Sequence, residues 1–221
     1  VAMENWTHDF NIGSMVRTAN AFQARCVHIV GPHKWNRKGA LMTELYQHVE
    51  HHPSIAELVE CWRNRIAGEI AAARAEAGAA ALHAHDIAAA SADASGADEI
   101  LSAGSAGNGE PLGDVRNRLN RLAQCTQAIA AADARIRELE AARVIALDII
   151  PGARPMETYA FPKRCLLLFG AEGPGLSEKA LQLADDVVYI SQFGSVRSIN
   201  AGAAAAVAMH AWIAQHAVIA R

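Results

Sequence analysis

Residues 165–177 read CLLLFGAEGPGLS, the pattern of a buried strand followed by a glycine-rich loop. The five apolar residues 165–169 predict the strand, and the glycines and proline of 170–176 predict a tight loop after it. Ser177 is a favourable N-cap residue, so we expect a helix to start there. A strand followed directly by a helix is the repeating unit of a parallel sheet.

The same pattern occurs elsewhere in the chain. Further strands are predicted at VAMEN (1–5), CVHIV (26–30), ARVIALDII (142–150) and DVVYI (186–190). Helical patterns lie at about 13–23, 54–62, 177–184 and 198–217. Alternating strands and helices predict an α/β fold, with a parallel sheet flanked by helices on both faces. Because ligands bind beyond the carboxyl ends of such strands, we expect a site at the loops after Val30, Phe169 and Ile190.

The middle of the chain has a different composition. Alanine dominates residues 63–143, and 79–113 contain almost no large apolar residue, which predicts a mobile or weakly helical tip. Apolar residues at helical spacing flank this tip: Val59, Trp62, Ile66 and Ile70 before it, and Leu122, Cys125, Ile129, Ala132, Ile136 and Leu139 after it. We therefore expect an antiparallel helical hairpin at 63–143, inserted between an N-terminal half-domain (1–62) and a C-terminal half-domain (144–221). The insert either contacts RNA or a partner or has no function of its own, and the second interpretation is favoured.

Charge and composition exclude several classes of protein. With 20 basic and 23 acidic side chains among 221 residues, the formal charge is −3, which excludes a globally basic nucleic-acid coat but not a local basic patch. No apolar run approaches the roughly 18 residues of a membrane span, and the first ten residues have no secretory-signal pattern. The four cysteines form no CxxC pair, so we expect reduced thiols in the cytoplasm instead of disulfides or a zinc site. The chain begins with Val1 instead of Met, which leaves room for an upstream segment.

The glycine loop matches neither of two common phosphate-binding loops. Its glycines fall as GxxGxG and not as the GxGxxG of dinucleotide-binding folds, and Leu176 occupies the position of the P-loop lysine. Glu172 is a polar residue at the carboxyl end of a strand. The loop is therefore either a structural turn or part of a site that includes Glu172.

Two other segments place polar residues at helix starts. In NIGSMVRTANAF (11–22), Arg17 lies one turn into a predicted helix, against the helix dipole, and an anionic ligand would account for it. In ISQFGSVRSIN (190–200), Ser198 is expected to cap the last helix and Asn200 to bond within the loop. Taken alone, the first segment is more typical of a surface arginine, and the second is equally compatible with a capped packing helix.

Together and in this order, NIGSMVRTANAF, LLLFGAEGPGLS and VYISQFGSVRSINAGAAAA closely resemble the three motifs of the SpoU (TrmH-type) branch of the SPOUT RNA methyltransferases. The resemblance covers about 1–60 and 144–221. It implies a C-terminal trefoil knot that binds S-adenosylmethionine, a homodimer formed through the knot region, and methylation of a ribose 2′-hydroxyl in tRNA or rRNA.

The resemblance also assigns roles to individual residues. Those implied in catalysis are Asn11, Arg17, Glu172, Ser198 and Asn200. Those implied in cofactor binding are Gly170, Gly175, Leu176, Ile190 and Ile199. Since arginine is always protonated, we expect Arg17 to clamp a phosphate beside the reacting ribose and not to act as a simple base. The chain departs from the family pattern in motif 3, where Ser191-Gln192 replaces Pro-Met, Ile199 replaces Leu, and Ala201-Gly202 replaces Val-Ser.

A basic run, HKWNRK (33–38), follows the predicted strand at 26–30. We expect Lys34, Arg37 and Lys38 to bind RNA phosphates together with Arg17, and the Trp35 ring to stack on a base.

A second polar cluster consists of His48, His51 and His52. Its HxxHH spacing matches neither HExxH nor a zinc finger, so we expect polar surface and no metal.

These observations favour a cytoplasmic, homodimeric RNA 2′-O-ribose methyltransferase that uses S-adenosylmethionine. The alternative is a non-catalytic RNA-binding protein that retains the SPOUT fold, which the altered motif 3 and the long insert suggest. A methyltransferase that acts on a base is a third possibility.

Overall fold

The structure is a computed structural model that describes residues 1–4, 9–32, 35, 37–101, 112–171, 175–195 and 198–218. Side chains are described for these residues except 9–10, 38 and 91–101. The chain divides into two compact units, one formed by Val1–Arg65 and Ala141–Arg221 and the other by Ile66–Glu140.

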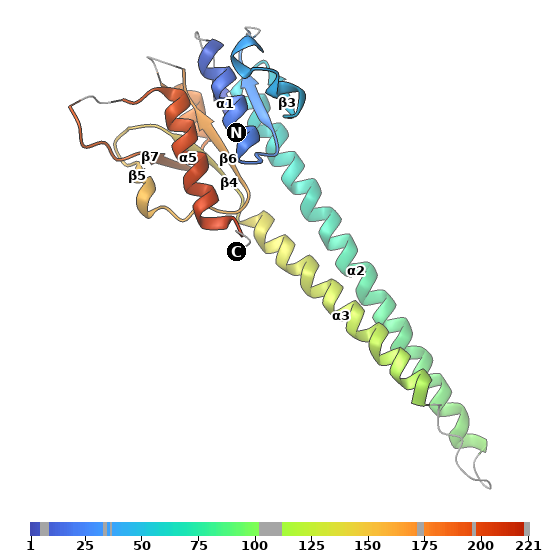
Figure 1. Ribbon diagram of the computed structural model, residues 1–221. Coiled ribbons are helices and arrows are strands. Elements are labelled where there is room, and N and C mark those ends of the chain that lie inside the picture. Colours follow the sequence, from blue (N-terminus) through green and yellow to red (C-terminus); the bar gives the residue numbers. More distant parts are fainter. Residues whose placement is uncertain are drawn as a thin grey trace. The chain divides into compact units, whose positions relative to one another are not determined.

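The first unit is built around a seven-stranded sheet in which every neighbouring pair of strands is parallel. The strands are β1 (Ala2–Glu4), β2 (Val27–Val30), β3 (Val49–His52), β4 (Arg143–Leu147), β5 (Arg154–Pro155), β6 (Cys165–Phe169) and β7 (Asp186–Tyr189). Their order across the sheet is β3-β2-β1-β6-β4-β7-β5 (Figure 1). The parallel sheet and five of its strands are therefore as predicted, whereas β3 and β5 were not anticipated.

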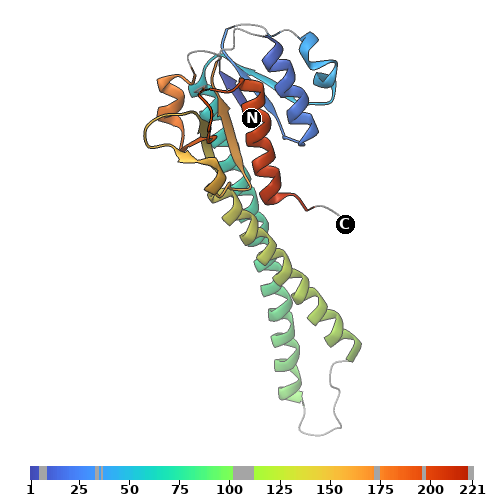
Figure 2. The ribbon, with the colours of Figure 1, turned by 60° about the vertical axis from the view of Figure 1, so that its left-hand side comes forward.

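Helices cover both faces of this sheet. The described part of the whole chain contains the helices α1 (Asp9–Ala21), α2 (Ile55–Leu101), α3 (Leu112–Glu140), α4 (Glu178–Leu183) and α5 (Ala201–His216). It also contains the short 3-10 turns η1 (Arg37–Ala40), η2 (Thr43–Leu45) and η3 (Met156–Thr158). Successive strand residues point to opposite faces, so Ile145 packs with α1 and α5, while Val144 packs with α4 and the start of α2 (Figure 2). The predicted two-sided covering is confirmed.

The unpredicted strand β3 changes the interpretation of the histidine cluster. His48 and His51 are exposed, as expected for polar surface. His52, by contrast, is only 7% exposed, so its assignment to the surface was wrong. The reason is that β3 pairs with β2, which turns alternate β3 side chains toward the helix-covered face.

The second unit is a helical hairpin formed by most of α2 and by α3, which run alongside each other (Figures 1 and 2). Ion pairs join the helices at two levels, with Arg74 2.9 Å from Glu140 and Arg135 3.6 Å from Glu76. This register places the buried Ile87 level with Cys125, which is also buried.

On α3 the predicted apolar stripe contains the buried residues Cys125, Ala132 and Leu139. On α2 the buried residues of the hairpin, Ala73 and Ile87, lie beyond the predicted stripe. The prediction for the tip was too loose. The helix α2 continues to Leu101, so residues 79–101 are regularly helical, and residues 102–111 lie outside the described part of the chain. Alanine has the highest helix propensity, so the composition that removes large core residues also favours helix. Among the described residues, no helix combines the length and the apolar character that a membrane crossing requires.

Candidate active site

A pocket of about 520 Å³ opens at the carboxyl ends of β4, β6 and β7. Its walls come from these strand ends, from the loop after β6 and from the segment before α5. Residues proposed from the sequence that line it are Gly170, Gly175, Ile190, Ser198, Ile199 and Asn200. A pocket was therefore correctly expected after Phe169 and Ile190, whereas no described residue of the loop after Val30 lines it.

The glycine loop closes tightly at the end of β6. Ala171 and Gly175 form an antiparallel bridge, with two backbone hydrogen bonds of 3.1 Å. A Cβ atom at Gly170 would lie 2.1 Å from the carbonyl carbon of Gly175, and Gly175 itself has a φ of +75°. This loop conformation therefore requires glycine at both positions. Glu172 lies outside the described residues.

Asp148 is a pocket residue that the sequence analysis missed. It follows β4, and its Oδ2 atom accepts a 3.2 Å hydrogen bond from the backbone N–H of Leu176. Leu176 is buried and is not among the residues that line the pocket, although the family resemblance implied a cofactor contact. An acidic residue directly after the apolar run of β4 is the signal that could have identified Asp148 from the sequence.

Two of the motif segments, far apart in sequence, meet where α1 and α5 pack together. Asn200 Nδ2 donates a 3.0 Å hydrogen bond to Asn11 Oδ1, across 189 residues of chain. Asn200 Oδ1 also accepts a 3.2 Å hydrogen bond from the Ala203 N–H, which makes Asn200 the N-cap of α5. The expectation that Ser198 caps this helix was wrong, because the helix begins at Ala201 and the N-cap is the residue before it.

Basic side chains lie on α1 and on the turn beside it. Arg17 is exposed on α1 and is not among the residues that line the pocket. Arg37 is exposed on η1. The turn η1 packs closely on α1: a Cβ atom at Gly13 of α1 would lie 2.3 Å from the carbonyl carbon of Gly39 of η1.

The structure does not show the lysines of the basic run at 33–38 as it shows Arg37. Lys34 and the side chain of Lys38 lie outside the described residues. Trp35, expected to stack on a base, is partly buried against the core.

Comparison with known sequences identifies related enzymes. A model of the SpoU rRNA methylase family matches residues 68–210, a range that includes the glycine loop and the segment before α5 but begins after Arg17. The chain is 42% identical over 64 residues to a tRNA (guanosine(18)-2′-O)-methyltransferase of Thermus thermophilus, and 40% identical over 58 residues to one of Saccharomyces cerevisiae. These alignments cover 29% and 26% of this chain but only 33% and 4% of the two relatives.

Solved structures share the fold at low sequence identity. The SpoU methyltransferase AviRb from Streptomyces viridochromogenes, in complex with AdoMet, superposes with a TM-score of 0.59 at 19% identity. That superposition covers 97% of this chain and 56% of AviRb, so the chain spans about half the length of that protein. A TrmH/SpoU tRNA modifying enzyme from A. aeolicus gives a TM-score of 0.58 at 12% identity and covers 97% of this chain and 73% of that one.

Proposed function

Because the chain belongs to the SpoU rRNA methylase family, we propose that it transfers a methyl group from S-adenosylmethionine to a ribose 2′-hydroxyl of tRNA or rRNA. The observation that carries this proposal is the pocket at the strand ends, which residues of the second and third motif segments line together. Target nucleotide and RNA class are left to experiment.

The pocket suits S-adenosylmethionine in size and chemistry. Its volume of about 520 Å³ falls within the roughly 300–1,000 Å³ of small-molecule sites. Leu147, Ile190 and Ile199 offer aliphatic surface for an adenine ring, and Asp148 and Asn200 supply polar groups. When bound, the cofactor would supply a methyl group whose C–S bond breaks as the ribose oxygen forms the new C–O bond.

The chain itself must then position a weak nucleophile and assist the loss of its proton. We assign Arg17 to clamping the phosphate beside the reacting ribose, since its guanidinium stays protonated and cannot act as a simple base. Ser198 and Asn200 orient the ribose from the pocket wall, and Asn11 holds the Asn200 amide in place. Glu172 keeps the catalytic role that the motif implies.

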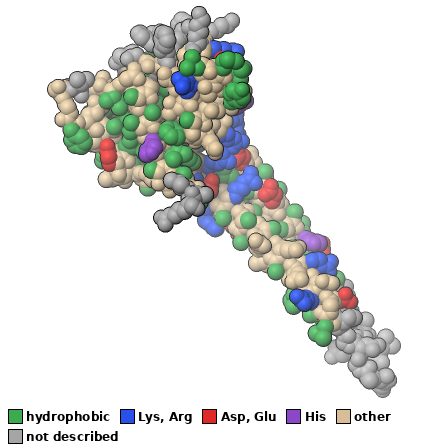
Figure 3. All heavy atoms as spheres, in the orientation of Figure 1, with side chains coloured by type: hydrophobic (Ala, Val, Ile, Leu, Met, Phe, Trp, Pro, Cys, Tyr) green, Lys and Arg blue, Asp and Glu red, His purple; other side chains and the backbone are tan. Residues whose placement is uncertain are grey.

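We propose that RNA phosphates are bound by Arg17 on α1 and Arg37 on η1, and by Lys34 and Lys38 of the same basic run. The chain carries a net charge of −3, so such binding depends on where the cations lie and not on overall charge. On the face that Figure 3 shows, both basic and acidic side chains lie along the described part of the hairpin. We assign RNA binding to the first unit because Arg17 belongs to a motif segment there.

We also propose a trefoil knot in the C-terminal half and a homodimer formed through that region, as in the family. The tight closure of the glycine loop, in which Gly175 approaches Gly170, supports a compact C-terminal half. All four cysteines are free, which agrees with the cytoplasm as the compartment.

Arg17→Ala separates the proposed enzyme from a non-catalytic RNA-binding protein. The proposal predicts that the wild-type chain methylates RNA, and that the variant loses methylation but still binds S-adenosylmethionine in equilibrium dialysis. Arg121→Ala, which removes an exposed arginine of α3, is the charge control and should keep its activity. A wild-type chain that binds RNA but transfers no methyl group would instead identify the non-catalytic protein.

A further inference from the structure

Side chains of the types that bind metals gather on one face of the edge strand β3 and its neighbour β2. In the register of this pair His28 lies opposite Glu50, and Val30 lies opposite His52. Alternate residues of a strand share a face, so these side chains project together toward the face covered by α2. The residues with donor atoms in this cluster are Cys26, His28, His48, Glu50 and His52.

Three of these donor atoms form a small triangle. His28 Nδ1 lies 3.1 Å from His52 Nε2 and 3.2 Å from Glu50 Oε2, and His52 Nε2 lies 3.5 Å from the same carboxylate oxygen. A tetrahedral ion with bonds of about 2.0–2.1 Å holds its ligand atoms about 3.3 Å apart. The edges of this triangle match that spacing.

Hydrogen bonds alone satisfy the triangle poorly. A neutral histidine has one ring N–H. If both rings donate to Glu50, two N–H groups face each other 3.1 Å apart. If only one ring donates, the lone pair of the other is left facing the carboxylate oxygen. A cation at the centre would accept a lone pair from each of the three atoms.

We propose that His28, Glu50 and His52 bind a divalent transition-metal ion of the zinc class, which fastens the edge strand β3 to β2. Two imidazoles and a carboxylate are ligands that zinc prefers, and a tetrahedral site leaves one position for a fourth ligand. This site is separate from the proposed methyl-transfer pocket and shares no residue with it.

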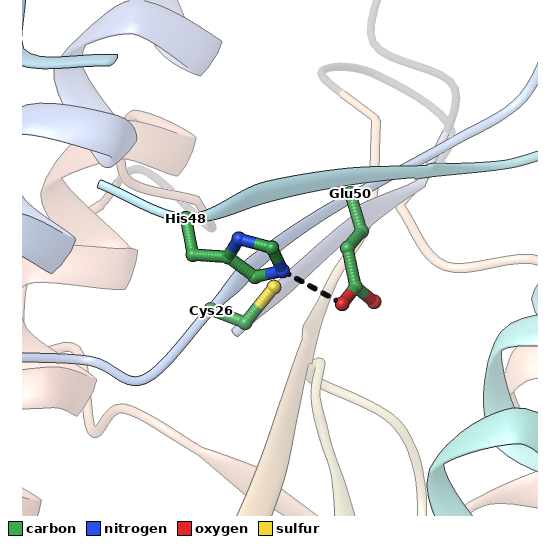
Figure 4. A group of neighbouring side chains, drawn as sticks. All are labelled: Cys26, His48 and Glu50. Carbon is green, nitrogen blue, oxygen red and sulfur yellow. Dashed lines mark hydrogen bonds and ion pairs between the residues drawn. The ribbon is translucent and has the colours of Figure 1, made fainter. Parts of the chain in front are cut away.

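Other donor groups lie beside the triangle. Cys26 Sγ lies 3.8 Å from His28 Nδ1 but groups with His48 and Glu50 and not with the triangle, so the fourth position of the proposed ion is left to a ligand from solvent. Cys26 and His48 also form a second, overlapping group with Glu50, and His48 Nε2 is 2.9 Å from Glu50 Oε1 (Figure 4). Because the His48 side chain is 64% exposed, an ion can enter from this side.

The carboxylate of Glu50 is already fixed in position. Arg65 on α2 donates hydrogen bonds of 3.1 and 3.3 Å to its two oxygens, as outer-shell groups do for metal-binding carboxylates. The guanidinium charge opposes a cation, so strong ligands such as imidazole are needed.

The test uses the full chain without a histidine tag, stripped with a chelator and reloaded with Zn²⁺ or Co²⁺. We expect one ion per chain at this site, measured by elemental analysis after gel filtration, and the visible absorption of tetrahedral Co²⁺. Glu50→Gln and His52→Gln should each weaken Zn²⁺ binding at least tenfold. The matched control is His51→Gln, the neighbouring exposed histidine on the opposite face of β3, which should bind as the wild type does.

Thermal melting with and without Zn²⁺ distinguishes loss of the site from loss of the fold. Zn²⁺ should raise the Tm of the wild type and of His51→Gln but not the Tm of Glu50→Gln. The Glu50→Gln variant still tests the site if His52→Gln does not fold. No bound ion in the folded wild type would overturn the proposal. Equal binding by Glu50→Gln and the wild type would overturn it as well.

Discussion

Gly170 is the residue at which a single methyl group most severely disturbs the proposed cofactor pocket. In Gly170→Ala the new Cβ atom would lie 2.1 Å from the Gly175 carbonyl carbon, 2.3 Å from the Leu176 nitrogen and 2.4 Å from the Gly175 oxygen. All three are backbone atoms, so the loop has to move as a unit.

The magnitude follows from what the loop loses. Overpacking costs about 1–3 kcal/mol, and opening the loop breaks both hydrogen bonds between Ala171 and Gly175, each contributing about 1 kcal/mol. A local penalty of about 3–5 kcal/mol results. If binding requires the closed loop, this penalty weakens affinity roughly 100- to 4,000-fold, at about 1.4 kcal/mol per factor of ten.

Isothermal titration with S-adenosylmethionine measures this loss, and circular dichroism confirms that the variant is folded. Gly194→Ala is the matched control, since a Cβ atom there would meet nothing within 4 Å, and its affinity should stay within about threefold of wild type. If Gly170→Ala binds as tightly as the wild type, the glycine loop does not shape the cofactor site and the reasoning fails.

Three further predictions concern the rest of the molecule. Asn200→Ala removes the N-cap of α5 and the hydrogen bond to Asn11, so urea unfolding should show a loss of about 1–2 kcal/mol; Asn200→Ser, which keeps a cap acceptor, should recover most of it, and equal stability of the two variants would contradict the capping role. Replacing 91–121 by a short glycine-serine linker cuts α2 and α3 at matching levels, so S-adenosylmethionine affinity should be unchanged; a large loss would mean that the tip supports the first unit. With a thiol reagent at pH 8, the exposed Cys61 should react fast and Cys165 slowly, because burial raises the pKa of Cys165 to about 12; a fast phase that persists in Cys61→Ser would contradict this.

Strands with continuous apolar sequence were predictable, and strands with polar sequence were not. The run at 165–169 is buried between two layers of helices, so hydrophobicity alone identifies it. By contrast, β3 reads Val-Glu-His-His and looks like a polar loop. Its charge is accommodated by partners that are distant in the sequence, His28 on β2 and Arg65 on α2, and no local pattern reveals them.

For the candidate site, the sequence located the glycine loop and the segment before α5, because motif order carries that information. It could not show that Asn200 contacts Asn11, since that hydrogen bond depends on how α1 and α5 pack. Asp148 was missed because it belongs to no motif and fell inside the strand predicted at 142–150, whereas β4 ends at Leu147. The alanine-rich tip was misjudged for another reason: helix propensity maintains α2 where large apolar side chains are absent.

The central claim is that this chain methylates a ribose hydroxyl of RNA. Incubation of the purified protein with labelled S-adenosylmethionine and either total tRNA or rRNA, followed by nucleoside mass spectrometry, tests it most directly. We expect label in a 2′-O-methylnucleoside from one of the two RNA classes. Label on a base, or none in either RNA class, would contradict it.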